Sequence, residues 1–123
     1  MKKKLATYRI VSEARLRWAW GSPQKMRLVV ELIRRRRAQA AADTLATCNR
    51  RAAEPILKLL RSAIANAGPE VDLDKLYVAE AFVDCGPSLK KRGRLDSTAR
   101  GGWPADPKKR RQSHITIRLG APA

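Results

Sequence analysis

The chain is short of the residue types from which active sites and disulfide frameworks are built. Its 123 residues include one histidine, His114, and two cysteines, Cys48 and Cys85, which stand far apart. Two thiols without Cys-x-x-Cys spacing make neither a zinc site nor a disulfide framework, so we interpret them as reduced, half-buried small side chains. The sequence holds no glycine-rich phosphate loop and no nucleophile–histidine pair. We therefore expect no catalytic residue, no metal, no cofactor and no enzymatic activity.

Long apolar runs are also missing. No stretch approaches the 18 apolar residues of a membrane span, so we expect no membrane partner. Residues 1–4 resemble the start of a signal peptide, but Arg9 and Glu13 interrupt the segment that follows. We expect a cytoplasmic protein, and because acidic residues are few early in the chain, an organellar address stays open.

Acidic residues are scarce as well. Eleven Asp and Glu stand against 27 Lys and Arg, which gives a formal net charge of +16 and a pI near 11.1. Such self-repulsion disfavours a compact state unless a polyanion cancels it. Nucleic acid and an anionic membrane surface both qualify, and a merely highly charged soluble surface is the third interpretation. Because the charge is clustered, we favour nucleic acid. The acidic group Glu70, Asp72 and Asp74 is interpreted as a solvated turn rather than as a metal or acid–base site.

What remains is enough for one globular domain over residues 1–123, since 44% of the residues are hydrophobic. Alternating apolar residues predict strands over 13–20, 76–83 and 114–119. Apolar residues three and four apart predict helices over 23–36 and 50–67, and an alanine-rich segment predicts a short helix over 38–48. The strand periodicity predicts Trp18, Trp20 and Tyr77 in the core. For Trp20, which is next to Gly21, an exposed position is the alternative.

Particular residues mark the ends of these helices. Ser22 and Pro23 fit the N-cap and first position of the first helix. Asn49 is expected to cap the third helix, in which Pro55 removes one backbone hydrogen bond and favours a kink. In the second long strand, Leu76, Val78, Glu80 and Phe82 are expected on one face, with Tyr77, Ala79, Ala81 and Val83 on the other.

The basic residues concentrate in a few places, which we expect to contact nucleic acid. Residues 88–112 hold nine basic and two acidic side chains, and we interpret residues 86–113 as an extended β-hairpin arm, on the order of 40 Å long. The run of arginines after the first helix also suits the helix dipole, which is the alternative interpretation. The expected RNA-binding residues are Arg15, Arg17, Lys25, Arg27, Arg34, Arg35, Arg36, Arg37, Lys90, Lys91, Arg92, Arg94, Arg100, Trp103, Lys108, Lys109, Arg110, Arg111 and His114.

Two of these residues have a second interpretation. His114 lies at the start of a strand and is interpreted as structural or phosphate-facing rather than as a base. Trp103, beside Gly101 and Gly102, either stacks on an unpaired base or packs against a neighbouring protein. A free-standing architectural binder of nucleic acid, perhaps of DNA, needs the same charge, so charge alone does not exclude it.

Four blocks of sequence resemble a known family. Residues 22–30 (SPQKMRLVV) resemble the first helix of the bacterial-type large-subunit ribosomal protein twenty-two family. Residues 51–67 look like its central helix, residues 82–90 like the strand that enters its long hairpin, and residues 113–117 (SHITI) like the returning strand. The blocks occur in family order and cover most of residues 22–119, which favours this family over the architectural binder.

The resemblance implies an α+β fold, with three helices packed on a small antiparallel sheet and a long protruding β-hairpin. It further implies a structural role in the large ribosomal subunit: binding and helping to assemble its RNA, contact with other proteins near the peptide exit tunnel, and a hairpin tip that faces the nascent peptide. Two features depart from the family. Residues 95–107 replace a tip usually rich in Pro, Arg, Ala and Gly, and residues 34–37 lack the usual Gly, which predicts an uninterrupted helix end in place of a turn.

Overall fold

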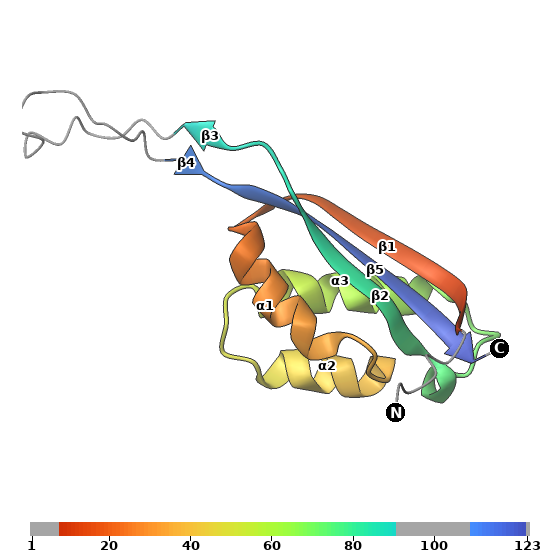
Figure 1. The fold of residues 1–123 in the computed structure, drawn as a ribbon. Helices are drawn as coiled ribbons and strands as arrows, with labels where there is room; N and C mark the ends of the chain where they lie inside the picture. Colours follow the sequence, from red (N-terminus) through yellow and green to blue (C-terminus); the bar gives the residue numbers. More distant parts are fainter. Residues whose placement is uncertain (1–7, 91–108, 123) are drawn as a thin grey trace, which may run out of the picture.

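The computed structural model describes residues 8–90 and 109–122, and these form a sheet with helices on one side (Figure 1). In chain order the elements are β1 (Tyr8–Trp20), α1 (Pro23–Ile33), α2 (Ala38–Thr47), α3 (Ala53–Asn66), the 3-10 turn η1 (Leu73–Lys75), β2 (Tyr77–Cys85), β3 (Leu89–Lys90), β4 (Lys109–Arg110) and β5 (Gln112–Pro122). The predicted α+β fold of three helices on a small antiparallel sheet is confirmed. The arm expected over residues 86–113 stays a prediction, because residues 91–108 lie outside the described part.

The main sheet is antiparallel with the order β1-β5-β2, so the last strand of the chain occupies the centre. Its residues Ser113, Ile115, Ile117 and Leu119 are all fully buried. These residues face the helices, as side chains two apart along a strand must. The strand expected over residues 114–119 is therefore confirmed and extends further at both ends.

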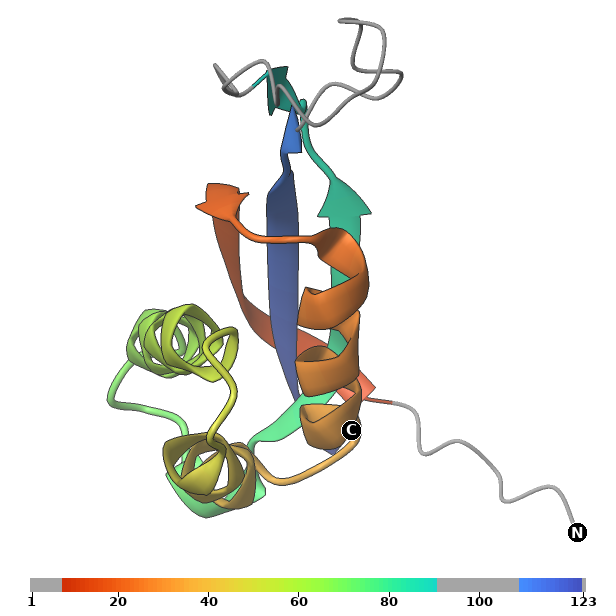
Figure 2. The ribbon, with the colours of Figure 1, turned by 90° about the vertical axis from the view of Figure 1, so that its left-hand side faces the viewer.

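The helices all cover the same face of this sheet (Figures 1 and 2). α1 packs over β2, α3 packs over β1, and α2 lies against α3. The helical side of the core is built from fully buried Val29, Val30, Ile33, Ile56 and Leu60. Full burial of each such side chain stabilises the fold by about 1.5–3 kcal/mol. In the described residues no helix covers the opposite face of the sheet, which we call the outer face.

The helix ends differ from the predictions in detail. Ser22 and Pro23 take the N-cap and first position of α1 as expected, although the Ser22 side chain makes no capping hydrogen bond. α3 begins at Ala53 rather than at residue 50, so Asn49 does not cap it. Pro55 then falls in the first turn, where its missing N–H has no partner to lose and gives no reason for a kink.

Two irregularities correct the expected faces of the strands. The register of β2 on β5 shifts between Val78 and Glu80, so that Val78 and Ala81 both point into the core. The expected grouping of Val78 with Glu80 and Phe82 is therefore wrong. A similar shift in β1 lies between Leu16 and Ala19. Such bulges place an extra residue in one strand and change which face the following side chains reach.

Candidate nucleic-acid interface

The root of the hairpin brings like charges together. β3 and β4 pair antiparallel beyond the end of the main sheet, with Leu89 opposite Arg110 and Lys90 opposite Lys109. All four side chains are exposed. Like charges directly opposite one another destabilise a strand pair. The arrangement therefore becomes favourable when an anion lies against the two lysines.

Backbone hydrogen bonds tie this root to the body of the protein. The N–H of Gly86 donates to the carbonyl of Gln112 at 2.9 Å, and the N–H of Gly21 donates to the carbonyl of Arg111 at 3.1 Å. A Cβ at Gly86 would lie 3.0 Å from backbone atoms of Gln112, so this close approach favours glycine. These backbone contacts help to fix the direction in which β3 and β4 leave the main sheet.

The segment between α1 and α2 is a turn bound to the edge of β2. α1 ends at Ile33, so the predicted extension to residue 36 and the uninterrupted helix end are wrong. The N–H of Arg35 donates to the carbonyl of Val78 at 3.0 Å, and the N–H of Val78 donates to the carbonyl of Arg36 at 2.9 Å. These bonds satisfy backbone groups that the edge strand would otherwise leave open. No basic residue lies in the last turn of α1, and only Arg34, its C-cap, adjoins the helix end. The helix dipole therefore accounts for at most one of the four arginines.

The four arginines of this turn do not form one uniform cluster. Arg34 donates to the carbonyl of Ala81 at 2.8 Å and pairs with Glu31 at 2.7 Å. Arg36 reaches Thr44 at 3.3 Å, and Arg37 donates to the Tyr77 hydroxyl at 3.2 Å. Arg35 makes no side-chain hydrogen bond to the described residues. Arg34 holds a carbonyl and a carboxylate at short distances, whereas Arg36 and Arg37 each make one longer bond to a neutral hydroxyl. Arg35, followed by Arg36 and Arg37, is therefore the better candidate for phosphate contacts.

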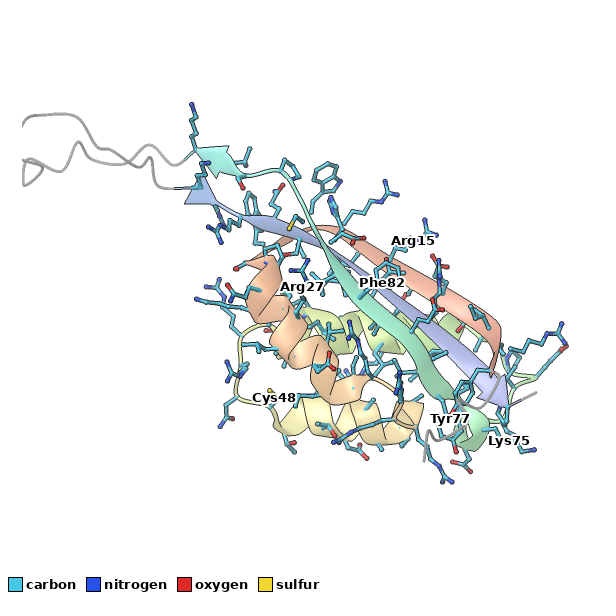
Figure 3. The ribbon with its side chains drawn as sticks, in the orientation of Figure 1. Arg15, Arg27, Cys48, Lys75, Tyr77 and Phe82 are labelled. Atoms are coloured by element: carbon cyan, nitrogen blue, oxygen red, sulfur yellow. The ribbon has the colours of Figure 1, made fainter. Side chains whose placement is uncertain are left out.

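Arg27 resembles Arg34 in this respect. Its Nε and Nη2 donate to the carbonyl of Val83 at 3.2 Å and 3.0 Å, which joins α1 to β2 (Figure 3). Lys25, two residues earlier on the same helix, is exposed and has no hydrogen bond or ion pair to the described residues. Of these two predicted contacts, the structure leaves Lys25 available and gives Arg27 a role in packing.

The outer face of the sheet carries alternating charges. Arg118 on β5 contacts Glu13 at 2.9 Å and Glu80 at 2.8 Å, and Arg15 also pairs with Glu13. Hydrogen bonds from Arg15 and then from Arg118 hold the pKa of Glu13 below its usual value. Arg15, labelled in Figure 3, is therefore partly neutralised. Arg17 is exposed and has no ion pair within the described residues.

Trp18 and Trp20 correct an expectation. Trp18 was predicted in the core, and Trp20 was predicted either in the core or exposed. The bulge in β1 turns both onto the outer face, where each is about half exposed, and places Ala19 in the core. Tyr77 is half-buried rather than in the core. The Arg110 guanidinium lies over the Trp20 ring, 3.8 Å from its centroid. An arginine on an aromatic face is a favourable contact, so it also helps to hold the hairpin root.

His114 takes the structural role that was one of its two interpretations. Its Nδ1 accepts a hydrogen bond from the backbone N–H of Trp18 at 3.1 Å. Its ring meets the Trp18 indole edge-on, with the centroids 4.9 Å apart. A direct contact of His114 with phosphate stays a prediction.

Some predicted contacts lie outside the described residues. These are Lys91, Arg92, Arg94, Arg100, Trp103 and Lys108. Conversely, the structure exposes cations that the sequence patterns did not single out. Their only signal in the sequence was their charge, since they stand apart from the basic clusters. They are Arg9 on β1, Arg50 and Arg51 before α3, and Arg61 on α3.

Groups for catalysis or metal binding are not gathered in the described part of the chain. Within residues 8–90 and 109–122, no three His, Cys, Asp or Glu side chains lie close enough together to hold a metal ion. Cys48 is half-buried as expected, but Cys85 is exposed, and both are free thiols. Among the described helices, none has the length and apolar character that crossing a membrane requires.

Comparisons with known proteins agree on one family. The model for the family described as ribosomal protein L22p/L17e matches residues 14–120. The large ribosomal subunit protein uL22 of Deinococcus radiodurans is 50% identical over 98 residues, which are 78% of this chain and 69% of that protein. The protein of the same name from Thermus thermophilus is 45% identical over 111 residues, or 89% of this chain and 94% of that protein. The matched region includes β3, β4 and the turn after α1.

Proposed function

Because the chain belongs to the family of ribosomal protein L22p/L17e, we propose that it binds the RNA of the large ribosomal subunit through phosphate contacts and helps that RNA to assemble. It is a ribosomal protein and not an enzyme. Its bacterial relatives are named as large-subunit proteins, which supports a place in the large subunit of a bacterial-type ribosome in the cytoplasm. Its partners are accordingly ribosomal RNA and other ribosomal proteins.

The pairing of Lys90 with Lys109 is the observation that carries the RNA-binding proposal. Two exposed lysines opposite each other on a two-residue ladder repel in the free protein. Exposed Arg110 and Arg111 continue the charge toward the main sheet. Phosphates along an RNA backbone cancel this repulsion and release their own counterions. Folded RNA hides its base edges in a deep groove, so we expect recognition by backbone shape and 2′-hydroxyl groups.

A salt titration tests the phosphate contacts. Full-length wild type and a Lys90→Gln/Lys109→Gln variant are titrated onto large-subunit RNA at several salt concentrations. The variant should bind more weakly at low salt, and its plot of log affinity against log salt should be shallower, by roughly 0.9 per lost phosphate contact if the duplex value applies. Incorporation of both proteins into large subunits is followed by sedimentation.

The chain offers a matched control for this experiment. Lys58 and Lys75 are also exposed, but each is paired with a carboxylate, Glu54 and Asp72 respectively, away from the hairpin. A Lys58→Gln/Lys75→Gln variant removes the same charge and should keep the wild-type slope. Equal slopes for the wild type and the hairpin variant would contradict the proposal.

The tip of the hairpin carries a second part of the proposal. The family resemblance supports an arm over residues 86–113 whose tip lines the exit tunnel and meets the nascent peptide and a neighbouring protein. Residues 95–107 depart from the usual composition of that tip, so this role is proposed from the stem residues on either side. A photo-crosslinker at position 103 in intact ribosomes should capture the nascent peptide, and capture of RNA alone would contradict it.

A further inference from the structure

The bulge in β1 places Trp18 in an unusual backbone conformation. Its φ is 62°, in the left-handed region that bulky residues rarely adopt. His114 on the neighbouring strand offsets part of this strain. It accepts a hydrogen bond from the Trp18 N–H, and its ring contacts the indole. Strained conformations of this kind persist where surrounding structure enforces them, and they concentrate at functional sites. The effect here is to present an indole on the outer face.

The exposure of the two tryptophans is not explained by packing within the described residues. Trp18 is 55% exposed and Trp20 is 47% exposed, on a sheet face that no described helix covers. Arg110 already occupies one face of the Trp20 ring. The edge-on contact between Trp18 and His114 leaves at least one face of the Trp18 ring open. Trp18 is therefore an aromatic surface available to a partner, and it is the more exposed of the two tryptophans.

Trp18 borders a hollow of about 480 Å³ on the outer face of the sheet. Phe82, Asp84, His114 and Thr116 are among the residues that line it. Arg15 and Arg17 line it beside Trp18. Arg17 has no ion pair within the described residues, whereas Arg15 shares Glu13 with Arg118. A partner for this site thus needs a flat apolar group with an anion attached on the Arg17 side.

We infer that the hollow binds an unpaired nucleotide of RNA, with its base stacked on Trp18 and its phosphate on Arg17. The inference rests on the proposed RNA binding and adds a site and a ligand class to it. A base in a duplex has both faces covered by its neighbours, so only an unstacked base presents a free face to an indole. Arg17, which has no ion pair within the described residues, favours a nucleotide over an apolar protein surface, because such a surface would leave its charge desolvated.

Stacking and charge differ in their dependence on salt, which makes the inference testable. Stacking on an aromatic side chain releases no counterions, whereas each phosphate contact does. Loss of Trp18 should therefore lower the affinity for single-stranded RNA without changing the salt slope. Loss of Arg17 should lower the slope by about 0.7, the single-strand value for one contact. If Trp18 had only a structural role, its loss would disturb Arg17 as well, and the affinity and the salt slope would fall together.

The first experiment uses the fluorescence of Trp18 itself. In full-length protein with Trp20→Phe and Trp103→Phe, Trp18 is the remaining tryptophan. Titration with a short single-stranded oligoribonucleotide of mixed sequence should quench its emission, and a duplex of the same length should not. Absence of quenching while the protein still binds large-subunit RNA would overturn the inference and leave the proposed function standing. Loss of all RNA binding would contradict both.

The second experiment removes the stacking group. Trp18→Asn keeps a residue that tolerates the left-handed conformation, and its affinity for the single-stranded probe should fall by about 5- to 150-fold with an unchanged salt slope. Trp18→Phe should lose less affinity than Trp18→Asn, because phenylalanine keeps an aromatic ring. Circular dichroism reports whether each variant folds. Leu28→Ala is the control, since Leu28 is 54% exposed on α1 and should leave the affinity unchanged. Equal affinities of wild type and a folded Trp18→Asn variant would overturn the inference.

Discussion

The backbone N–H of Arg35 donates to the carbonyl of Val78 at 3.0 Å while Arg35 holds a φ of 60°. This relationship ends α1 and turns the chain along the edge of β2. A left-handed conformation costs a residue with a Cβ roughly 1–2 kcal/mol, and glycine avoids that cost. The turn is therefore enforced by its hydrogen bonds to β2 rather than by the local preference of the arginine.

Arg35→Gly should raise the free energy of unfolding. Relief of the strained backbone outweighs the greater freedom that glycine gives the unfolded chain, about 0.4–1 kcal/mol, so the net gain should be about 0.8 kcal/mol and at most about 1.6 kcal/mol. Urea unfolding followed by circular dichroism measures this difference. The same variant should bind RNA more weakly, because it loses one exposed cation.

Arg36→Gly separates the backbone effect from the charge effect. It removes the same charge one residue later, at a position whose φ is not positive. The free energy of unfolding should fall there, by about 0.4–1 kcal/mol. If Arg35→Gly proved no more stable than Arg36→Gly, strain at Arg35 would not be the controlling factor.

Substitution of Arg27 should lower the stability of the protein, whereas substitution of Lys25 should lower its affinity for RNA. Arg27→Met removes two hydrogen bonds to the Val83 carbonyl, so we expect the free energy of unfolding to fall by about 1.5–3 kcal/mol. Lys25→Met removes an exposed cation and should lower RNA affinity and its salt slope while leaving unfolding unchanged within about 0.5 kcal/mol. Chemical unfolding and RNA titration on the same preparations give both values. A Lys25 variant that lost stability but kept its salt slope would contradict this division.

The sequence predicted those parts of the fold that depend on regular periodicity. Apolar spacing predicted α1 and α3, alanine content predicted α2, and the Ser22–Pro23 pair correctly marked the start of α1. It did not predict the bulges, because the residues that flank Ala79 and Trp18 alternate regularly on either side. A single inserted residue changes the face of every side chain that follows, and its position depends on pairing with β5.

The same limit applies to the candidate site. Charge predicted that the arginines after α1 would lie on the surface, which they do. It did not show that Arg27 and Arg34 bind backbone carbonyls of β2, since those partners are more than forty residues away in the chain. The exposure of Trp18 depends in the same way on tertiary contacts, namely the hydrogen bond and ring contact with His114.

The ion pairs of Glu13 should give the protein a pH-dependent stability. Hydrogen bonds from Arg15 and Arg118 lower its pKa in the folded state below the ordinary 4.5. The folded protein then holds fewer protons on Glu13 than the unfolded chain, so this contribution is present above pH 4.5 and is lost as the pH falls through the folded pKa. Glu13→Gln should remove this component from a plot of unfolding free energy against pH. Glu70→Gln, at an exposed carboxylate without an ion pair in the described residues, should leave it in place.

Asp84 should decide which base the hollow accepts. Its carboxylate lines the hollow with Trp18 and lies opposite His114 in the sheet. Cytosine presents an amino donor that a carboxylate accepts, whereas uracil presents a carbonyl that it repels. Wild type should therefore bind oligocytidylate about tenfold more tightly than oligouridylate, the effect of one hydrogen bond to a charged group. Asp84→Asn should narrow that ratio, because an amide donates to uracil as readily as it accepts from cytosine. The control is Asp74→Asn, which removes an exposed carboxylate from η1 and should keep the wild-type ratio. If Asp84→Asn left the ratio unchanged, the Asp84 side chain would not contribute to base recognition.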